Sequence, residues 1–133
     1  MFSTRLNETA TSLGLLLIRI LSGGMMMTHG WGKIAKWGEL KSSFPDPFGI
    51  GHEISLGLTV FAEFICAGLL VVGLASRLVL IPLLIVMAVA FFKIHATDPL
   101  GDKELALFYL ILYTALLLTG PGKFSLDRYW LKK

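Results

Sequence analysis

The sequence predicts an all-α, polytopic membrane protein, folded as an antiparallel bundle of four transmembrane helices. Of its 133 residues, 55% are hydrophobic and 16% are charged, and the mean hydropathy is +0.74. A soluble domain carries about a quarter charged residues, and one core in a chain of this length could not bury so much apolar surface. The apolar residues also gather in four runs. Together these observations indicate that lipid is the solvent.

Each apolar run approaches the length of a spanning helix, which needs about 20 residues, or about 17 at the short end. We expect helices at residues 13–31, 54–74, 78–94 and 104–119. The fourth run is short unless Lys103 and Glu104 belong to its first turn. Arg19 interrupts the first run and no small-residue cleavage site follows it, so this run is expected to be a retained helix and not a signal peptide.

The connecting segments favour an antiparallel order within a single domain, residues 1–133. Residues 32–53 are polar and contain Pro45 and Pro47, which indicate a loop. Residues 75–77 alone join the second run to the third, which forces a hairpin. The tail, residues 123–133, mixes aromatic and basic side chains and is expected to lie along the membrane interface.

The basic residues flank the apolar runs and form no basic stripe with interleaved aromatics, so the sequence indicates a lipid bilayer partner and no nucleic acid. Slightly more of them fall on the side of the termini, which favours cytoplasmic termini. The single cysteine, Cys66, excludes an internal disulfide and a CxxC pair. Because it lies in an apolar run, burial is expected, with a reactive thiol as the alternative.

Arg19 and Glu63 are charged residues at hydrocarbon depth. Such a charge costs at least about 2.5–3.5 kcal/mol near the bilayer centre and persists with a partner or a function. When each residue's depth is counted along its helix from the side of the termini, the two differ by less than the length of the arginine side chain. We therefore predict that they pair across adjacent helices. Met26 and Lys33 share the Arg19 stripe, and we assign these three residues to ligand binding. The alternatives are a pair that only fixes helix packing, and no pairing.

The histidines are expected on the side opposite the termini, with Glu104 at the same level. The sharper interpretation is a mouth lined by His29, His95 and Glu104 that opens towards Glu63. Neutral imidazole and carboxylate can exchange protons with a quinol near neutral pH, so these four residues are the candidate catalytic groups. The plainer interpretations are interfacial histidines and a glutamate that complements the positive end of the fourth helix.

The cofactor that these groups suggest is a quinone. A haem held by His29 and His95 is conceivable because both are expected near one depth, but it is not favoured. No metal is expected, since the sequence contains no paired-ligand spacing such as HxxxH or HExxH.

In order and spacing, several features resemble the DoxX family of small bacterial inner-membrane proteins with four helices. They are Leu17-Ile18-Arg19, His29-Gly30 with Lys33, Glu63, Gly73 to Arg77, His95, Glu104 to Leu107, and Gly120 to Asp127. The resemblance covers residues 13–127. It implies a link to quinone redox chemistry, because some relatives are described as a subunit of thiosulfate:quinone oxidoreductase and others belong to complexes that handle oxidative or thiol stress.

The preferred hypothesis is a subunit of a membrane redox system that binds a quinone-like amphiphile within its helix bundle. If the chain takes part in catalysis, the expected role is that of a quinone-linked oxidoreductase subunit. The alternative is a non-catalytic scaffold that recruits soluble oxidoreductases through residues 32–53 and 123–133. A small-molecule carrier ranks third, because residues 78–92 and 105–119 contain no charged residue. Gly23 and Gly30 can serve close contacts within the bundle or between protomers of a homo-oligomer.

Overall fold

The computed structural model describes residues 6–94 and 97–130, and all the regular elements in these two ranges are helices. The first helix, α1, is followed by the short α2, and the last two helices are α6 and α7. The helices form longer rods, of which the second, His52–Val72, is interrupted by a π-helical stretch and the third, Ser76–Ile94, ends in one. The bounds are α1 Glu8–Ala35, α2 Trp37–Leu40, α3 His52–Val60, η1 Phe61–Cys66, α4 Ala67–Val72, α5 Ser76–Val89, η2 Ala90–Ile94, α6 Leu100–Thr119 and α7 Leu126–Trp130.

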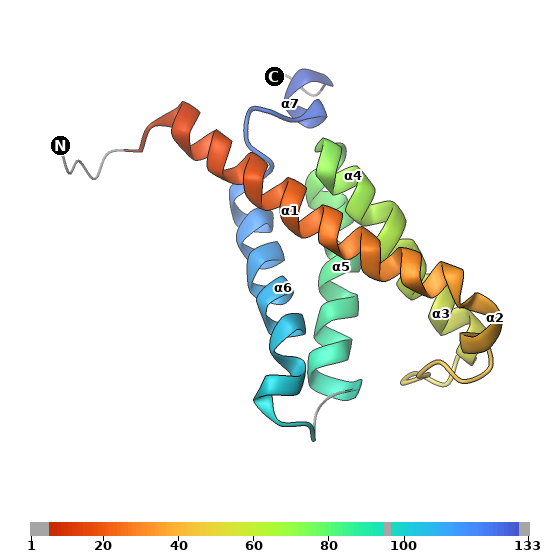
Figure 1. The fold of residues 1–133 in the computed structure, drawn as a ribbon. Helices are drawn as coiled ribbons and strands as arrows, with labels where there is room; N and C mark the ends of the chain where they lie inside the picture. The colour runs from red at the N-terminus through yellow and green to blue at the C-terminus, as the bar shows by residue number, and fades with distance from the viewer. Residues whose placement is uncertain (1–5, 95–96, 131–133) are drawn as a thin grey trace.

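The helices are arranged as an antiparallel bundle (Figure 1). The start of α1 and α7 lie at one end, and the loop of residues 41–51 and the start of α6 lie at the other. The helix α1 runs obliquely across the bundle and packs along η1 and α4, while α5 packs along α6. The predicted all-α membrane class is therefore confirmed.

Three helical rods in the described residues are long and apolar enough to cross a membrane. They are Glu8–Ala35, His52–Val72 and Ser76–Ile94. The predicted fourth span is the helix α6, of 20 residues, but its first turn carries Asp102, Lys103 and Glu104. These charges shorten its apolar part, so the predicted count of four spanning helices is not exact.

Polar side chains and glycines set the helix ends. The side chain of Asn7 accepts a hydrogen bond from the Ala10 N–H and caps α1, with Glu8 in the first turn, where a negative charge is favourable. The rod of α3, η1 and α4 ends at Gly73, which adopts a left-handed conformation with φ +77°. A residue without Cβ adopts this conformation without strain, which explains the glycine at this end.

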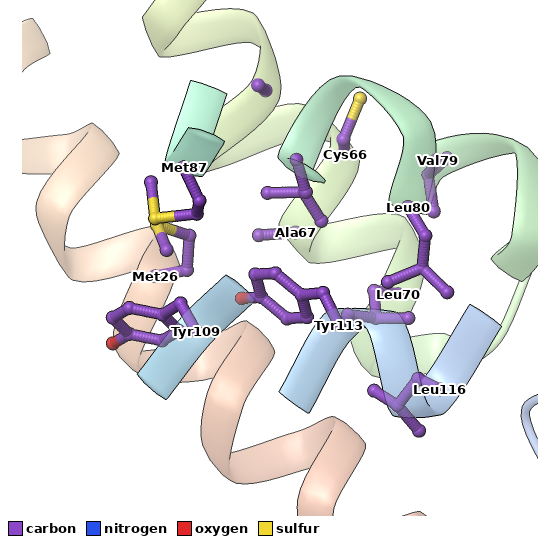
Figure 2. Packing of buried hydrophobic residues seen from close by; sticks show 12 residues of the cluster. Met26, Cys66, Ala67, Leu70, Val79, Leu80, Met87, Tyr109, Tyr113 and Leu116 are labelled. Atoms are coloured by element: carbon purple, nitrogen blue, oxygen red, sulfur yellow. The ribbon is translucent and has the colours of Figure 1, made fainter. Parts of the chain in front are cut away.

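The core lies where the three rods and α6 meet, and Figure 2 shows its buried side chains. The Tyr113 hydroxyl donates to the Ser22 carbonyl at 3.1 Å and so joins α6 to α1. Cys66 is buried, as expected. Large side chains on the outer faces, such as Leu17 and Leu118, are exposed, which suits helices whose surroundings are lipid.

Arg19 is the largest fully buried side chain of the described residues, with 1% of its surface exposed. Its guanidinium donates three hydrogen bonds to carbonyls: Nε to Leu70 at 2.9 Å, Nη2 to Val71 at 3.0 Å and Nη1 to Pro121 at 2.8 Å. The first two carbonyls belong to the last turn of α4, where few helical N–H groups remain to pair with them; the Leu70 carbonyl also accepts from the Gly73 N–H at 3.0 Å. Arg19 therefore closes the end of α4 and holds the turn after α6 against it.

The expected Arg19–Glu63 pair does not form, although both residues are described. Gly30, not Arg19, lies beside Glu63, since a Cβ at Gly30 would be 2.9 Å from the Glu63 carbonyl carbon. Gly30 is eleven residues beyond Arg19, or about 16 Å along a helix. The prediction placed the start of the first apolar run level with the end of the second, whereas α1 begins at Glu8 and crosses the bundle obliquely.

Residues 120–128, which we call the terminal latch, join three parts of the chain. The Asp127 carboxylate accepts from the N–H groups of Ala75 and Ser76 at 2.6 and 2.7 Å, at the start of α5, where a negative charge complements the helix dipole. The Asp127 N–H donates to the Gly73 carbonyl at 2.8 Å. A Cβ at Gly73 would lie 2.4 Å from that of Ser125, so this close approach needs the glycine.

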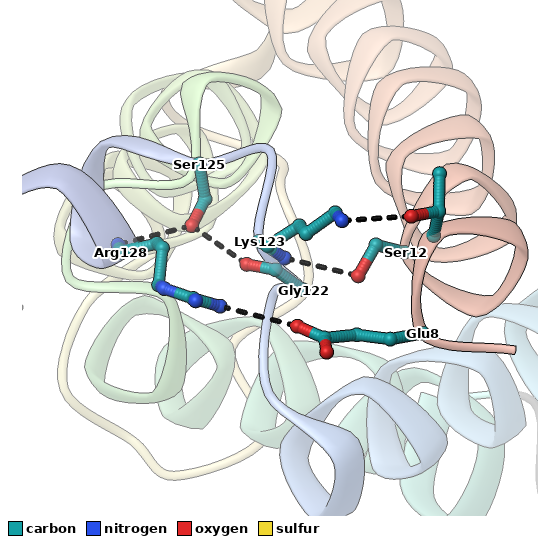
Figure 3. A network of polar contacts seen from close by, with 7 residues as sticks. Glu8, Ser12, Gly122, Lys123, Ser125 and Arg128 are labelled. Carbon is teal, nitrogen blue, oxygen red and sulfur yellow. Dashed lines mark hydrogen bonds and ion pairs between the residues drawn. The ribbon is translucent and has the colours of Figure 1, made fainter.

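The terminal latch also holds the start of α1 (Figure 3). The Lys123 N–H donates to Ser12 Oγ at 3.2 Å and its Nζ to Thr9 Oγ1 at 2.8 Å, while Arg128 lies 3.9 Å from Glu8. The segment predicted as an interfacial tail, residues 123–133, thus contains α7 and is held against the bundle as far as Arg128. Residues 131–133 lie outside the described residues.

The loop of residues 41–51 is held by Asp46, whose carboxylate accepts hydrogen bonds from the N–H groups of Ile50 and Gly51 and from the Ser55 hydroxyl, at 2.9–3.0 Å. The bond from Gly51 is the main reason that the pKa of Asp46 lies below its ordinary value of 3.8. The His52 ring also contacts the Phe44 carbonyl. The loop therefore has a defined shape against α3.

We expect Arg19→Met to lower the free energy of unfolding in mixed micelles by at least about 2 kcal/mol, because it removes three hydrogen bonds from a charged donor to backbone carbonyls. The matched control is Arg128→Met, which removes an exposed arginine from the same end and should change stability by less than about 0.5 kcal/mol. Equal effects of the two substitutions would contradict this role of Arg19.

We expect the loop of residues 41–51 to loosen in acid. Because folding lowers the pKa of Asp46, its contribution is complete above pH 3.8 and is lost as the pH falls through the folded pKa. Protection of the Ile50 and Gly51 amides from hydrogen exchange should decline over that range, and Asp46→Asn should lower it at all pH values. Protection that does not change with pH in the unsubstituted protein would contradict the expectation.

Candidate ligand-binding site

Glu63 lies within η1, the π-helical stretch in the second rod. Such stretches are rare and frequently occur at functional sites. The Glu63 side chain is 6% exposed, so it sits inside the bundle at the level of the last turns of α1. Its burial requires a partner of opposite charge or a protonated carboxyl.

Lys33 supplies that partner. Its Nζ lies 2.7 Å from Glu63 Oε1, and its side chain is 24% exposed. Gly30 makes the contact possible, since a Cβ there would lie 2.9 Å from the backbone of Glu63 and Phe64. The two helices therefore approach closely one turn before Lys33, and the buried carboxylate meets an ammonium at the edge of the bundle.

The larger cavity, of about 410 Å³, lies between α3 and η1, the end of the third rod and the loop of residues 41–51. Its polar lining is Lys33, Ser55, Thr59 and Glu63. The loop provides an apolar wall that includes Phe44 and Phe48, and the Lys93 ammonium lies 4.9 Å from the centre of the Phe48 ring. The rest of the lining is aliphatic: Leu58, Ile85, Val86, Val89, Ala90 and Ile94, with Pro45, Pro47 and Ile50 from the loop.

The smaller cavity, of about 180 Å³, lies between α1, the third rod and α6. It is lined by Met26, His29, Glu63, Met87, Ala90, Lys103, Leu105, Ala106 and Tyr109. The His29 ring meets the Tyr109 ring edge-on, with 6.1 Å between centroids. Tyr109 also stacks on Tyr113, as Figure 2 shows beside Met26.

The structure brings four of the predicted site residues together. Met26 and His29 line the smaller cavity, Lys33 lines the larger one, and Glu63 lines both. Arg19 was assigned to ligand binding, but it lies with the terminal latch and donates to three backbone carbonyls there.

The expected mouth is only partly described. Glu104 is exposed in the first turn of α6, and its neighbour Lys103 is the residue that lines the smaller cavity. His95 lies outside the described residues, so the haem alternative, which needs it beside His29, stays untested. Among the described residues, no three His, Cys, Asp or Glu side chains gather into a metal site.

Sequence reasoning missed Tyr109 and both π-helical stretches. Tyr109 and Tyr113 are spaced i, i+4 in an apolar run, which places their hydroxyls on one helix face. Buried tyrosines usually find hydrogen-bond partners, so this spacing was a usable signal. The π-helical stretches arise where one extra residue enters a helical turn, and the sequence contains no proline or glycine pattern that marks them.

Residues 14–96 match the family model for DoxX, which is more than half of the chain. The chain belongs to the DoxX family. It is 30% identical to an uncharacterized membrane protein of Mycobacterium tuberculosis over 136 residues, covering 85% of this chain and 78% of the relative. It is 27% identical to an uncharacterized protein of Haemophilus influenzae over 131 residues, covering 92% and 87% of the two chains. No solved structure matches.

The two cavities differ in how much of their lining falls within the residues that match the DoxX model. Lys33 and Glu63 lie within the matched residues, and so do the loop of residues 41–51 and the described part of the third rod. Tyr109 and the rest of α6 lie beyond them. The larger cavity is therefore built from the part of the chain that defines the DoxX match, and α6 completes the smaller one.

We expect Lys33→Met and Glu63→Gln to be coupled in a double-mutant cycle. Lys33→Met should destabilise more, because it leaves a buried carboxylate, whereas a freed Lys33 can extend to water. The interaction free energy in mixed micelles should be about 1–3 kcal/mol. The control pair, Lys36→Met with Glu63→Gln, removes an exposed lysine of the same helix end and should be additive within about 0.5 kcal/mol. Additivity of the Lys33 pair would contradict the ion pair.

Proposed function

We propose that this DoxX-family membrane protein binds a quinone-like amphiphile in the larger cavity, as a subunit of a redox system in the bacterial inner membrane. The observation that carries the proposal is the ion pair between Lys33 and the buried Glu63 carboxylate in the wall of a mainly apolar cavity. A volume of about 410 Å³ is within the range of small-molecule sites. Apolar pockets with a few placed polar groups are the usual form of such sites.

The ion pair suits both oxidation states of a quinone head group. An ammonium has three N–H donors, so Lys33 can donate to a carbonyl oxygen of the oxidised ring while it contacts Glu63. The Glu63 carboxylate accepts hydrogen bonds and can accept one from a hydroxyl of the reduced ring. The hydroxyls of Ser55 and Thr59 are further polar groups in the same wall.

The apolar lining suits the rest of such a ligand. The aromatic side chains of the loop can cover a ring, and the aliphatic side chains of the third rod can cover the first part of a tail.

Electrons would pass to or from a soluble partner oxidoreductase at the membrane surface. The slight excess of basic residues near the termini supports cytoplasmic termini.

The scaffold alternative assigns the working surfaces to residues 32–53 and 123–133. In the structure the first segment contributes Lys33 and a wall of the larger cavity, and the second forms most of the terminal latch. Both segments therefore have roles inside the chain, which favours ligand binding over the scaffold.

We expect a short-chain benzoquinone to raise the melting temperature of the protein in nanodiscs by several degrees when it is well above its Kd. Lys33→Met and Leu58→Trp, which alter the polar and the apolar wall, should each reduce the shift. Lys36→Met is the matched control and should retain it. A melting temperature that does not change across the titration would reject quinone binding.

A further inference from the structure

Glu63 forms part of the wall between the two cavities. Glu63 and Ala90 are the two residues that line both, and they belong to the two π-helical stretches, η1 and η2. One carboxylate therefore has access to two spaces of different chemistry. The larger space is mainly apolar, whereas the smaller one contains an imidazole, an ammonium and a phenol.

The smaller cavity contains a buried polar atom without a partner. Tyr109 is 4% exposed, and its hydroxyl has no hydrogen-bond partner within the described part of the chain. A buried hydroxyl without a hydrogen-bond partner is destabilising, so a polar molecule in the space beside Tyr109 would be favourable. The cavity volume of about 180 Å³ is enough for several water molecules.

The cavity also connects the interior with the surface. Glu63 and Tyr109 are buried, whereas His29 and Leu105 in the same lining are exposed. The lining extends from Tyr109, midway along α6, to Lys103 and Leu105 near the start of that helix, at the end of the bundle where α6 begins (Figure 1). Water at His29 can therefore be continuous with water beside Glu63.

We propose that the smaller cavity is a water-filled passage through which Glu63 exchanges protons with the aqueous phase, while the larger cavity holds the amphiphile. A proton released by the head group would bind a Glu63 carboxylate oxygen and then pass through water to the His29 imidazole. Water and imidazole are effective proton carriers near neutral pH. This use of the passage rests on the proposed function, but its hydration does not.

The groups that face Glu63 come from every rod packed against it. From α1 they are Lys33 and His29, and from α6 they are Lys103 and Tyr109. From α3 they are the hydroxyls of Ser55 and Thr59. The third rod contributes only apolar side chains to the two linings. The charged and titratable groups of the smaller cavity thus lie on α1 and α6, the two walls of the proposed passage.

Substituted-cysteine labelling tests the passage without a quinone. Cys66→Ser removes the single cysteine, and Glu63→Cys then places a thiol where the two cavities meet. In nanodiscs, a charged, water-soluble methanethiosulfonate reagent should modify this thiol, because thiolates react where water reaches them. Intact mass measured over time gives the labelling rate.

Two matched substitutions identify the route of water. Ala106→Phe adds bulk to the lining of the smaller cavity alone and Val89→Phe to that of the larger one alone. Ala106→Phe should slow labelling about tenfold or more, and Val89→Phe less than about twofold. Ala106→Leu is the milder substitute if the phenylalanine variant does not elute as a folded protein.

Two outcomes would overturn the proposal. No labelling of the folded Glu63→Cys protein would mean that the smaller cavity is dry. Labelling that Val89→Phe slows and Ala106→Phe does not would mean that water reaches Glu63 through the larger cavity. Either result is separate from the benzoquinone titration, so a failure of the passage and a failure of ligand binding can be told apart.

Discussion

The buried guanidinium of Arg19 is the constraint on which the arrangement of the helices depends. A charge at this depth persists only where its donors are satisfied, and the carbonyls of Leu70, Val71 and Pro121 satisfy them. These contacts set the position of α1 along the second rod. The same register brings Gly30 against the backbone of Glu63 and lets Lys33 reach its carboxylate.

The two ends of the bundle differ in packing. At the terminal latch, Gly73 and Ser125 are so close that a Cβ on the glycine would not fit, and Asp127 caps the start of α5. At the opposite end, the π-helical stretches and the loop of residues 41–51 surround two cavities. The bundle therefore combines a closely packed end with a hollow end, so the proposed ligand would not need to displace the contacts of the terminal latch.

The features by which the sequence resembles the DoxX family fall into two groups, one at each end of the bundle. The segment after Gly120 forms the terminal latch, which contacts both Arg19 and the segment after Gly73, so these three features support the fold. His29 and Glu63 line the cavities. The family resemblance thus combines a structural set and a candidate site set, and the two lie at opposite ends of the molecule.

The sequence by itself determined the membrane class, the helical rods and the buried stripe of α1, because apolar content, run length and helical periodicity are local properties. It also singled out Glu63, His29, Lys33 and Met26, which the structure places in the linings of the two cavities. Only the tertiary structure decided which charges pair, because pairing depends on the tilt and register of α1 against the second rod. For the same reason it alone revealed Tyr109 beside His29, the π-helical stretches and the carboxylate shared by two cavities.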